Sequence, residues 1–156
     1  MIKIVKVPDP ILRKKTEDVK KIDARLLDFI DEMRKMIKDK GVGLAAPQVG
    51  KSLNFSVIGF TPSEEQLKKD PDLVAIPEIV LINPHITWKS KDTAVEKEGC
   101  LSIDKTEVSV PRHKKIHIKY QDIKMKPQTI KARGYLARVL QHETDHLQGK
   151  LITDYK

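Results

Sequence analysis

The chain has 156 residues, of which 39% are hydrophobic and 33% are charged, and its formal net charge is +8 at pH 7. Because apolar residues recur along the whole length, the composition excludes a disordered chain and indicates one domain over residues 1–156. The longest apolar runs are far shorter than the roughly 20 residues that a membrane-spanning helix needs. The amino terminus also lacks the pattern of an export or transit signal, so we expect a cytoplasmic protein with no membrane partner.

An amphipathic helix over residues 23–40 is the first element that the sequence predicts. Asp23 is a typical N-cap, apolar side chains follow it at spacings of three and four residues, and Gly41 ends the pattern after a basic last turn. Residues 41–50 are rich in glycine and alanine, which lets the backbone lie close to a ligand or to another backbone. A strand is expected over residues 53–60, and residues 61–78, with three prolines, indicate a long surface segment or lid.

The second half of the chain predicts further strands and one more helix. Extended runs cover residues 79–82, 86–89 and 116–120, and residues 128–131 form a shorter candidate strand. The last helix is expected over residues 132–147. This order favours an α+β fold in which antiparallel sheets pack around the C-terminal helix, with the N-terminal amphipathic helix as a second helical element.

The last helix carries the strongest chemical signal, the HExxH pattern HETDH at residues 142–146. Residues four positions apart lie one above the other on a helix, so the rings of His142 and His146 can reach one metal ion. Glu143 lies beside them, where a carboxylate can touch a metal-bound water. The plainer interpretation is a polar helix face with two solvated histidines.

A hydrolytic metal site needs a third protein ligand and one open position. The residues after His146 include no histidine and only one acid, so we expect the third ligand upstream. The candidates are Cys100, His85, His113 and His117. We favour Cys100, the only cysteine, because a lone thiol is readily explained as a thiolate ligand. The alternative is that Cys100 is a small buried apolar side chain.

Nearly all of the excess positive charge lies in the last third of the chain. Residues 1–104 contain 18 Lys and Arg against 17 Asp and Glu, whereas residues 105–156 contain 12 against 5. A basic surface of this kind attracts polyanions such as RNA over long distances. A solvated lysine-rich surface is the plainer interpretation, since the lysines are not interleaved with aromatic residues.

Three segments together resemble the signature motifs of the peptide deformylases, in the same order along the chain. They are GVGLAAPQ at residues 41–48, EGCLS at residues 98–102 and QHETDHLQG at residues 141–149. The resemblance spans nearly the whole chain. It implies a metal-dependent amide hydrolase that removes the formyl group from the formyl-methionine of nascent polypeptides and releases formate.

The resemblance also implies roles for single residues. Cys100, His142 and His146 would hold one divalent metal ion, and Glu143 would act as general base and acid on a metal-bound water that attacks the formyl carbon. The side-chain amide of Gln48 and the backbone N–H of Leu101 would meet the developing oxyanion. The family implies ferrous iron as the metal in cells, and zinc, nickel and cobalt also suit one thiolate with two imidazoles.

Substrate binding is expected to use main-chain pairing, with the peptide as an extra strand between the glycine-rich loop and the segment around the cysteine. The candidates for this pairing are Val42, Gly43, Leu44, Glu98 and Gly99. Helical spacing before His142 places Tyr135, Arg138 and Val139 at the wall of an apolar pocket for methionine, with the Arg138 guanidinium kept in water. Glu98 is expected to pair with Arg112, as matching positions do in the family, and Asp145 either orients the helix or is solvated.

Two positions depart from the family pattern. Asp104 replaces a usual proline and is expected to loosen the strand that receives substrate, and Ile152 replaces a common phenylalanine. We expect a monomer without the C-terminal helix of many bacterial members, so a ribosome contact would have to use the basic last third. The alternatives are a general metallopeptidase or amidase that cleaves unformylated peptides, and a zinc-stabilised RNA-binding module with a closed four-ligand site.

Overall fold

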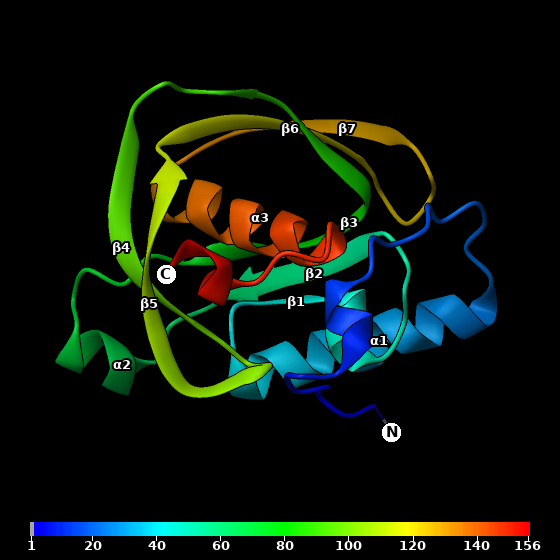
Figure 1. Ribbon diagram of the computed structural model, residues 1–156, viewed down its shortest axis with the longest axis horizontal. Helices are drawn as coiled ribbons and strands as arrows, with labels where there is room; N and C mark the ends of the chain where they lie inside the picture. Colours follow the sequence, from blue (N-terminus) through cyan, green and yellow to red (C-terminus); the bar gives the residue numbers. More distant parts are fainter. Residues whose placement is uncertain (1) are drawn as a thin grey trace.

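Seven β-strands and three α-helices build the fold of residues 2–156, the part of the chain that the computed structural model describes (Figure 1). The helices are α1 (Ala24–Lys40), α2 (Glu64–Lys69) and α3 (Gly134–Leu147). The strands are β1 (Gly43–Ala45), β2 (Phe55–Phe60), β3 (Ile76–Lys89), β4 (Thr93–Cys100), β5 (Ile103–His113), β6 (Lys115–Gln121) and β7 (Pro127–Arg133). Short 3-10 helices lie at η1 (Pro10–Arg13), η2 (Ala46–Val49) and η3 (Ile152–Tyr155).

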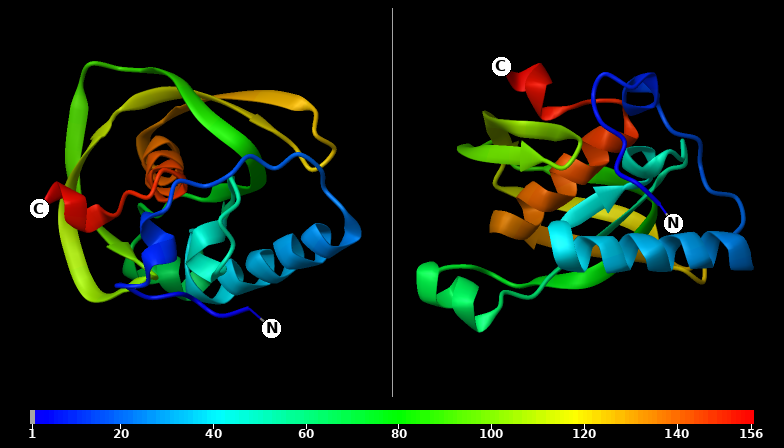
Figure 2. Two further views of the ribbon diagram at one scale, coloured as in Figure 1. Left: turned by 45° about the vertical axis from the view of Figure 1, so that its right-hand side comes forward. Right: turned by 90° about the horizontal axis from the view of Figure 1, so that it is seen from below.

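The strands form two antiparallel sheets that curve around α3. One sheet has the order β1-β2-β3-β6-β7, and β4 and β5 form a separate hairpin. Figures 1 and 2 show α3 in the middle of the molecule, with the hairpin along one side and the larger sheet arching around the rest. The predicted α+β class, with antiparallel sheets around a C-terminal helix, is therefore confirmed. No helix of residues 2–156 has the length and apolar character needed to cross a bilayer.

The central strands β2 and β3 are buried on both faces, which explains their continuous apolar sequences. Val57 and Val80 are paired and pack in the cluster that includes α1, whereas Ile58 and Leu81 pack in the cluster that includes α3. Because successive side chains of a strand point to opposite faces, each strand contributes to both clusters. The sheet is thus a layer between the two long helices.

Helix α1 supports the sheet from the face opposite α3. The Asp23 carboxylate accepts a hydrogen bond from the N–H of Leu26 at 2.9 Å, as expected of an N-cap. The buried side chains of this helix recur at spacings of three and four residues and are Leu26, Ile30, Met33 and Ile37. The helix ends at Lys40, and strand β1 follows it directly along the chain.

Several boundaries differ from the sequence-based expectation. The runs at residues 79–82 and 86–89 belong to the single strand β3, which continues through register shifts in its pairing with β6 instead of ending. The expected surface segment at residues 61–78 contains α2 and the start of β3. Helix α3 begins at Gly134, because Ala132 still pairs with Ile116 in the sheet.

The sequence patterns do not predict the β4–β5 hairpin, and only the family resemblance implies a strand at Asp104. Charged and exposed side chains dominate both strands, and the apolar Val95 of β4 is 63% exposed. An apolar period of two is confined to the buried Val108 and Val110 of β5, which is too short to predict a strand. The omission matters because β4 ends at Cys100 and so positions a candidate metal ligand.

Candidate metal centre

Three side chains with metal-binding atoms converge between α3 and β4. His142 and His146 lie one turn apart on α3, and Cys100 is the last residue of β4. The Nε2 atoms of the two histidines are 3.3 Å apart, and Cys100 Sγ lies 3.5 Å from His146 Nε2. All three ligand atoms lie within 4.8 Å of one another. The structure thus brings together the three residues that the sequence selected.

The separations of His146 Nε2 from His142 Nε2 and from Cys100 Sγ match two edges of a tetrahedral metal site. With metal–nitrogen and metal–sulfur bonds of about 2.0 and 2.3 Å, neighbouring ligand atoms are about 3.3 to 3.6 Å apart. One thiolate and two imidazoles suit zinc and other first-row metals. The group that converges among residues 2–156 contains three ligands, one fewer than a closed structural zinc site requires. The donor set therefore fits one divalent ion with an open coordination position.

Burial and neighbouring groups shift the pKa values of the two histidines in opposite directions. Burial lowers the pKa of His142, but hydrogen bonds to Cys100 and Glu98 outweigh this effect and raise that pKa to about 10. Burial and then the positive charge of His142 hold the pKa of His146 well below its usual value. The two rings, one turn apart on α3, therefore have different electrostatic environments.

Glu98 lies behind His142 and fixes the orientation of its ring. Glu98 Oε1 is 2.8 Å from His142 Nδ1, and Arg112 donates to the two carboxylate oxygens at 2.8 and 2.9 Å. Burial raises the pKa of Glu98, but the hydrogen bonds from Arg112 and His142 outweigh it and lower that pKa to about 2. An ionised Glu98 keeps the His142 proton on Nδ1 and leaves Nε2 for a metal. The expected Glu98–Arg112 pair is confirmed.

Arg138 is buried, so the expectation that its guanidinium stays in water is wrong. Only 6% of Arg138 is exposed. Its guanidinium donates to Glu98 Oε2 at 2.5 Å and to the backbone carbonyls of Val110 and Ala94 at 3.0 and 2.8 Å. Helical spacing could not reveal these acceptors, because they lie on the hairpin that the sequence did not predict. Arg138 joins α3 to β4 and β5.

Asp145 extends the same network on the other side of Arg112. Its Oδ2 accepts hydrogen bonds from Arg112 Nη1 at 2.5 Å and from the Tyr155 hydroxyl at 2.7 Å. Arg112 is 4% exposed and therefore needs acceptors for most of its donors. Of the two interpretations of Asp145, the orienting role agrees with these contacts and the solvated helix acid is wrong.

Glu143 is a buried carboxyl group beside the two histidines. It is 3% exposed, and burial raises its pKa to about 7, although His142 and Arg112 act in the opposite direction. Its Oε1 has no hydrogen-bond partner within residues 2–156. On the other side, a Cβ added to Gly43 would lie 2.6 Å from Oε2. Glycine at position 43 therefore leaves room for the Glu143 carboxyl group against β1.

Gln48 and Leu101 flank the Cys100 ligand. Gln48 is 2% exposed, and its Oε1 accepts a hydrogen bond from the N–H of Ala45 at 3.0 Å. That bond directs Nε2 to the other side, where it lies 3.2 Å from Ser102 Oγ and 3.6 Å from Cys100 Sγ. Leu101 follows Cys100 in the turn between β4 and β5. A side-chain amide donor thus lies beside the Cys100 thiol.

A cavity of about 640 Å³ opens onto these residues. Its lining includes most of the predicted site residues, namely Cys100, His142, Glu143, Gln48, Leu101, Val42, Gly43, Glu98, Gly99, Tyr135, Arg138 and Val139. Leu44 is not on this lining, because its side chain is fully buried in the cluster between α1 and the sheet. The sequence missed the lining residues of the hairpin, which are Glu96, Lys97, Ile103, Lys105, Thr106 and Glu107.

The other histidines considered as ligands lie elsewhere. His113 Nδ1 is 2.6 Å from the carbonyl oxygen of Ser90. The His117 ring packs against Trp88 with centroids 4.7 Å apart, and His85 is exposed on β3. The structure does not bring any of these three to the ligand group of residues 2–156.

Comparison with known proteins gives one consistent result. The sequence pattern of the polypeptide deformylase family matches residues 1–156. A peptide deformylase of Bartonella tribocorum is 41% identical over 156 residues, which cover 99% of this chain and 84% of the relative. The fold is similar to that of peptide deformylase from Thermotoga maritima, with 38% identity, 99% and 97% of the two chains covered and a TM-score of 0.84. It is also similar to Met-Ala-Ser-bound class I type b peptide deformylase from Acinetobacter baumannii, with 28% identity, 100% and 98% covered and a TM-score of 0.90.

Proposed function

The chain belongs to the polypeptide deformylase family of metal-dependent hydrolases, which remove the N-formyl group from nascent polypeptides, and we propose that Cys100, His142 and His146 form the core of its active site. The observation that carries this proposal is the convergence of one thiol and two imidazoles within 4.8 Å. The buried carboxyl group of Glu143 lines the same cavity as Cys100 and His142.

The metal is proposed to be ferrous iron in cells, with zinc, nickel and cobalt as alternatives that suit the same ligands. When bound, a divalent ion of this kind lowers the pKa of water and polarises the formyl carbonyl group. The contribution of the chain is to hold three ligand atoms at fixed separations. Glu98 adds to this by keeping His142 in the tautomer that leaves Nε2 free.

Glu143 is the proposed general base and general acid. Its pKa of about 7 lies in the range where one carboxyl group can both accept and donate a proton at neutral pH. Glu143 accepts a proton from the water that adds to the formyl carbon. It then gives this proton to the methionine nitrogen as the carbon–nitrogen bond breaks, so that formate and a free N-terminal amine are released.

Gln48 and Leu101 are proposed to stabilise the negative charge that develops on the formyl oxygen. Gln48 Nε2 is held by the bond from Ala45 to the other end of its amide, so the donor needs no reorientation during the reaction. A single donor of this kind typically contributes about 10²–10³ in rate. The N–H of Leu101 supplies a second donor from the other wall of the cavity.

The substrate peptide is proposed to lie between two strand edges that border the cavity. β1 is the terminal strand of the larger sheet, and β4 is an edge of the hairpin. A peptide between these two strands pairs with backbone groups of residues 42–44 and 98–101. Leu44 takes part through its backbone, while the Leu44 side chain stays buried. Tyr135 and Val139 then face the methionine side chain. A structure of the Acinetobacter baumannii relative contains Met-Ala-Ser, a tripeptide that begins with methionine, which supports a peptide of this kind as the ligand.

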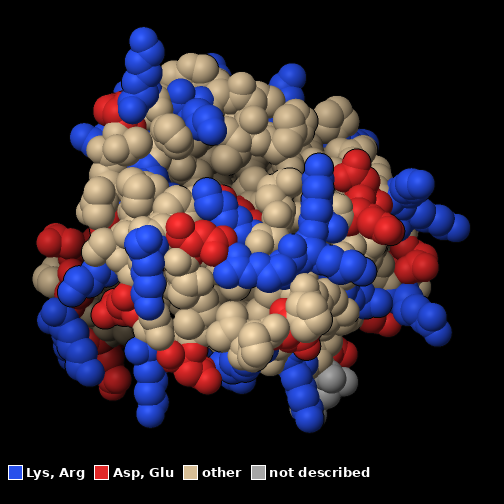
Figure 3. Space-filling view, in the orientation of Figure 1, with Lys and Arg blue, Asp and Glu red and all other residues tan. Residues whose placement is uncertain are grey.

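The basic last third of the chain contributes a charged surface on the sheet. Lys115 and Lys119 alternate with the buried Ile116 and Ile118 on β6. On β7, Arg133 lies opposite Lys115 and Lys131 lies opposite His117, which completes a set of four cationic side chains, Lys115, Lys119, Lys131 and Arg133. We call these four residues the basic sheet face. On the side of the molecule seen in Figure 3, by contrast, acidic residues are interspersed among the basic ones. We propose that the basic sheet face contacts ribosomal RNA.

Co-sedimentation with ribosomes tests this contact. The double variant Lys115→Glu/Lys131→Glu should bind more weakly, and parental binding should fall with added salt. A matched control is Lys35→Glu/Lys38→Glu on the exposed side of α1. Binding that ignores salt, or that both double variants weaken equally, contradicts the proposal.

Formate release tests the proposed reaction. Protein purified without oxygen and analysed for metal should release formate from formyl-Met-Ala-Ser. Acetyl-Met-Ala-Ser and unformylated Met-Ala-Ser are the controls, and neither should be cleaved. Cleavage of the unformylated peptide would instead favour the general metallopeptidase.

A further inference from the structure

The Leu101 donor lies in a tight turn that needs support from elsewhere in the chain. Cys100 pairs with Ile103, so Leu101 and Ser102 alone form the loop of the β4–β5 hairpin. Two-residue hairpin loops favour turn types with positive φ, because these match the twist of the strands. Neither Leu101 nor Ser102 is among the described non-glycine residues with positive φ. The twist of β4 and β5 therefore does not by itself favour the turn type observed at Leu101 and Ser102.

Residues 5–7, which we call the N-terminal strap, connect the two sides of the oxyanion site. The N–H of Val5 donates to the carbonyl of Gln48 at 2.6 Å, and the N–H of Val7 donates to the carbonyl of Ser102 at 3.0 Å. The N-terminal strap therefore forms hydrogen bonds with the backbone of Gln48 and with the turn that contains Leu101, the two residues proposed as oxyanion donors.

Lys6 lies between these two bonds and reaches the turn with its side chain. Its Nζ donates to the carbonyl of Leu101 at 2.8 Å and to Asp104 Oδ1 at 2.6 Å. The Leu101 carbonyl belongs to the peptide between the two loop residues, and rotation of that peptide converts one turn type into another. Such a rotation changes ψ of Leu101 and turns the Ser102 N–H, whereas the Leu101 N–H belongs to the preceding peptide. By holding the Leu101 carbonyl, Lys6 fixes the position of the residue that carries the Leu101 N–H. The Lys6 bond opposes that rotation.

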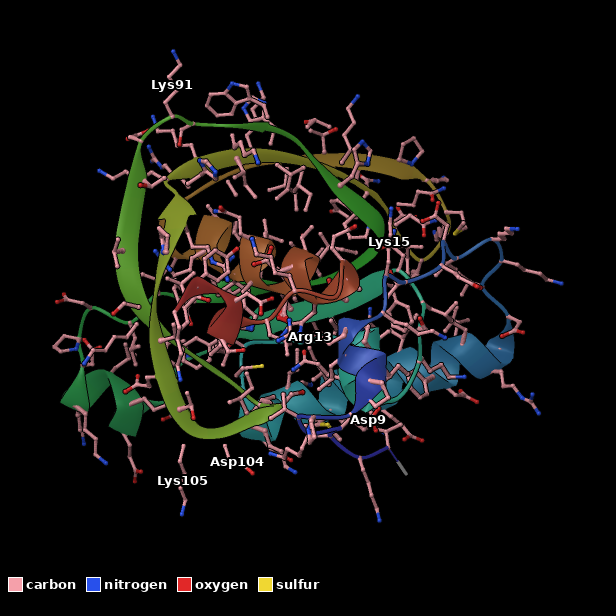
Figure 4. All side chains as sticks on the ribbon, viewed as in Figure 1. Asp9, Arg13, Lys15, Lys91, Asp104 and Lys105 are labelled. Atoms are coloured by element: carbon pink, nitrogen blue, oxygen red, sulfur yellow. The ribbon has the colours of Figure 1, made fainter. Side chains whose placement is uncertain are left out.

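We propose that Lys6 is a positioning residue of the deformylation reaction: its ammonium group holds the Leu101 turn so that the Leu101 N–H meets the oxyanion, and Asp104 holds the ammonium group in place. This inference rests on the proposed role of Leu101 as an oxyanion donor. Asp104, which was expected to loosen this strand, thereby supports it from the start of β5. Figure 4 shows Asp104 at the lower edge of the molecule, where the hairpin turns.

A purely stabilising ion pair would behave differently. The side chains of Lys6 and Asp104 are 46% and 72% exposed, and ion pairs of this kind add little to folding stability. Arg13 and Asp154 form a comparable pair at 2.7 Å, with side chains 50% and 32% exposed. No hydrogen bond of Arg13 reaches the Leu101 turn within the described chain, so Arg13→Met is a matched control.

The test compares zinc-loaded parent protein with Lys6→Met, Lys6→Arg, Asp104→Asn and Arg13→Met. For Lys6→Met we expect kcat for formyl-Met-Ala-Ser to fall about tenfold, which is part of the factor of about 10²–10³ that an oxyanion donor typically contributes. The KM, the amount of bound metal and the unfolding temperature should stay unchanged. Lys6→Arg should restore most of the rate because it keeps a cationic donor. Asp104→Asn should show a smaller loss, and Arg13→Met none.

Amide NMR of the same zinc-loaded proteins gives a second readout that does not depend on turnover. The Leu101 and Ser102 resonances should shift or broaden in Lys6→Met and not in Arg13→Met. Unchanged resonances, a parental kcat in Lys6→Met, or a kcat loss that only follows lost metal would each overturn the role of Lys6. If the parent itself released no formate, the proposed function would fail, and the NMR comparison would still decide whether Lys6 holds the turn.

Discussion

Helix α3 and the β4–β5 hairpin supply the proposed metal ligands in different ways. The helix carries His142 and His146, and its buried side chains, such as Leu140, pack into the apolar cluster of the large sheet. The hairpin carries Cys100 on strands with many charged or exposed side chains, and its buried Ile103, Val108 and Val110 pack in a smaller apolar cluster. The position of the helix is thus set by packing in the cluster of the large sheet, whereas the hairpin combines a small apolar cluster with buried polar contacts to its surroundings.

Those polar contacts come from both sides of the hairpin. Arg112 and Arg138 join it to α3 through Glu98, and the N-terminal strap joins its turn to the Gln48 segment. The difference between the two regions suggests a division of roles. The helix fixes the groups that carry out proton transfer and ligation, and the hairpin networks align the remaining ligand and the oxyanion donors with them.

The largest expected effect comes from the helix side. Glu143→Ala should lower kcat by about 10³–10⁴, because it removes the proposed proton carrier, while bound metal stays at the parental level. Steady-state formate release and metal analysis check this outcome. Glu107→Ala, which removes an acid of the same cavity on β5, is the matched control. Loss of metal in Glu143→Ala would show that Glu143 is a ligand and not a base.

Removing an arginine from the hairpin network should affect structure and metal binding together. Arg112→Met leaves the buried Glu98 and the half-buried Asp145 carboxylates without their shared partner, so the free energy of unfolding should fall by about 3 kcal/mol. Metal affinity should fall about 10–100-fold, because Glu98 then orients His142 less firmly. Urea unfolding and competition with a chelator measure the two effects. Lys114→Met, which breaks an exposed pair, should change neither.

A smaller effect is expected where β1 meets α3. Gly43→Ala places a Cβ 2.6 Å from Glu143 Oε2, so the carboxyl group must move, and kcat should fall about tenfold. The control is Gly41→Ala, whose Cβ meets only the end of the flexible Leu101 side chain at 3.2 Å. Equal rates in both variants would mean that the position of Glu143 is not critical.

The smallest effect is expected at a surface pair that serves neither region. A hydrogen bond from Arg13 lowers the pKa of Asp154. A lowered carboxyl pKa stabilises the folded state above the usual Asp value, and this contribution disappears as the pH falls through the lower folded-state value. Arg13→Met should therefore reduce the free energy of unfolding by about 1 kcal/mol or less at pH 7, and by a vanishing amount well below pH 4. A loss of unfolding free energy in Arg13→Met that grows as the pH falls would contradict this prediction.

The two regions also differ in what the sequence could reveal. The capped helix α1 and the histidine pair of α3 depend on spacings of three and four residues, which local sequence displays directly. The class of the fold followed from the same patterns. Cys100 could be selected because it is the only cysteine, and Gln48 and Leu101 because their segments resemble family motifs.

The hairpin and its contacts were not predictable in this way. Apolar alternation in this region is confined to Val108 and Val110 of β5, because exposed or charged side chains occupy most of the other positions. The buried guanidinium of Arg138 was misjudged, since its acceptors lie on strands that were not recognised. The bond from Lys6 to Leu101 joins residues 95 positions apart, and no local pattern indicates such a contact.

X-ray absorption spectroscopy of the metal-loaded protein tests the central claim most directly. Ligation by Cys100, His142 and His146 predicts one sulfur neighbour at about 2.3 Å and two imidazole nitrogens at about 2.0–2.1 Å from a zinc ion. The sulfur signal should disappear in Cys100→Ser, and the nitrogen signals should remain. A metal surrounded only by nitrogen and oxygen in the parent protein would contradict the proposed centre.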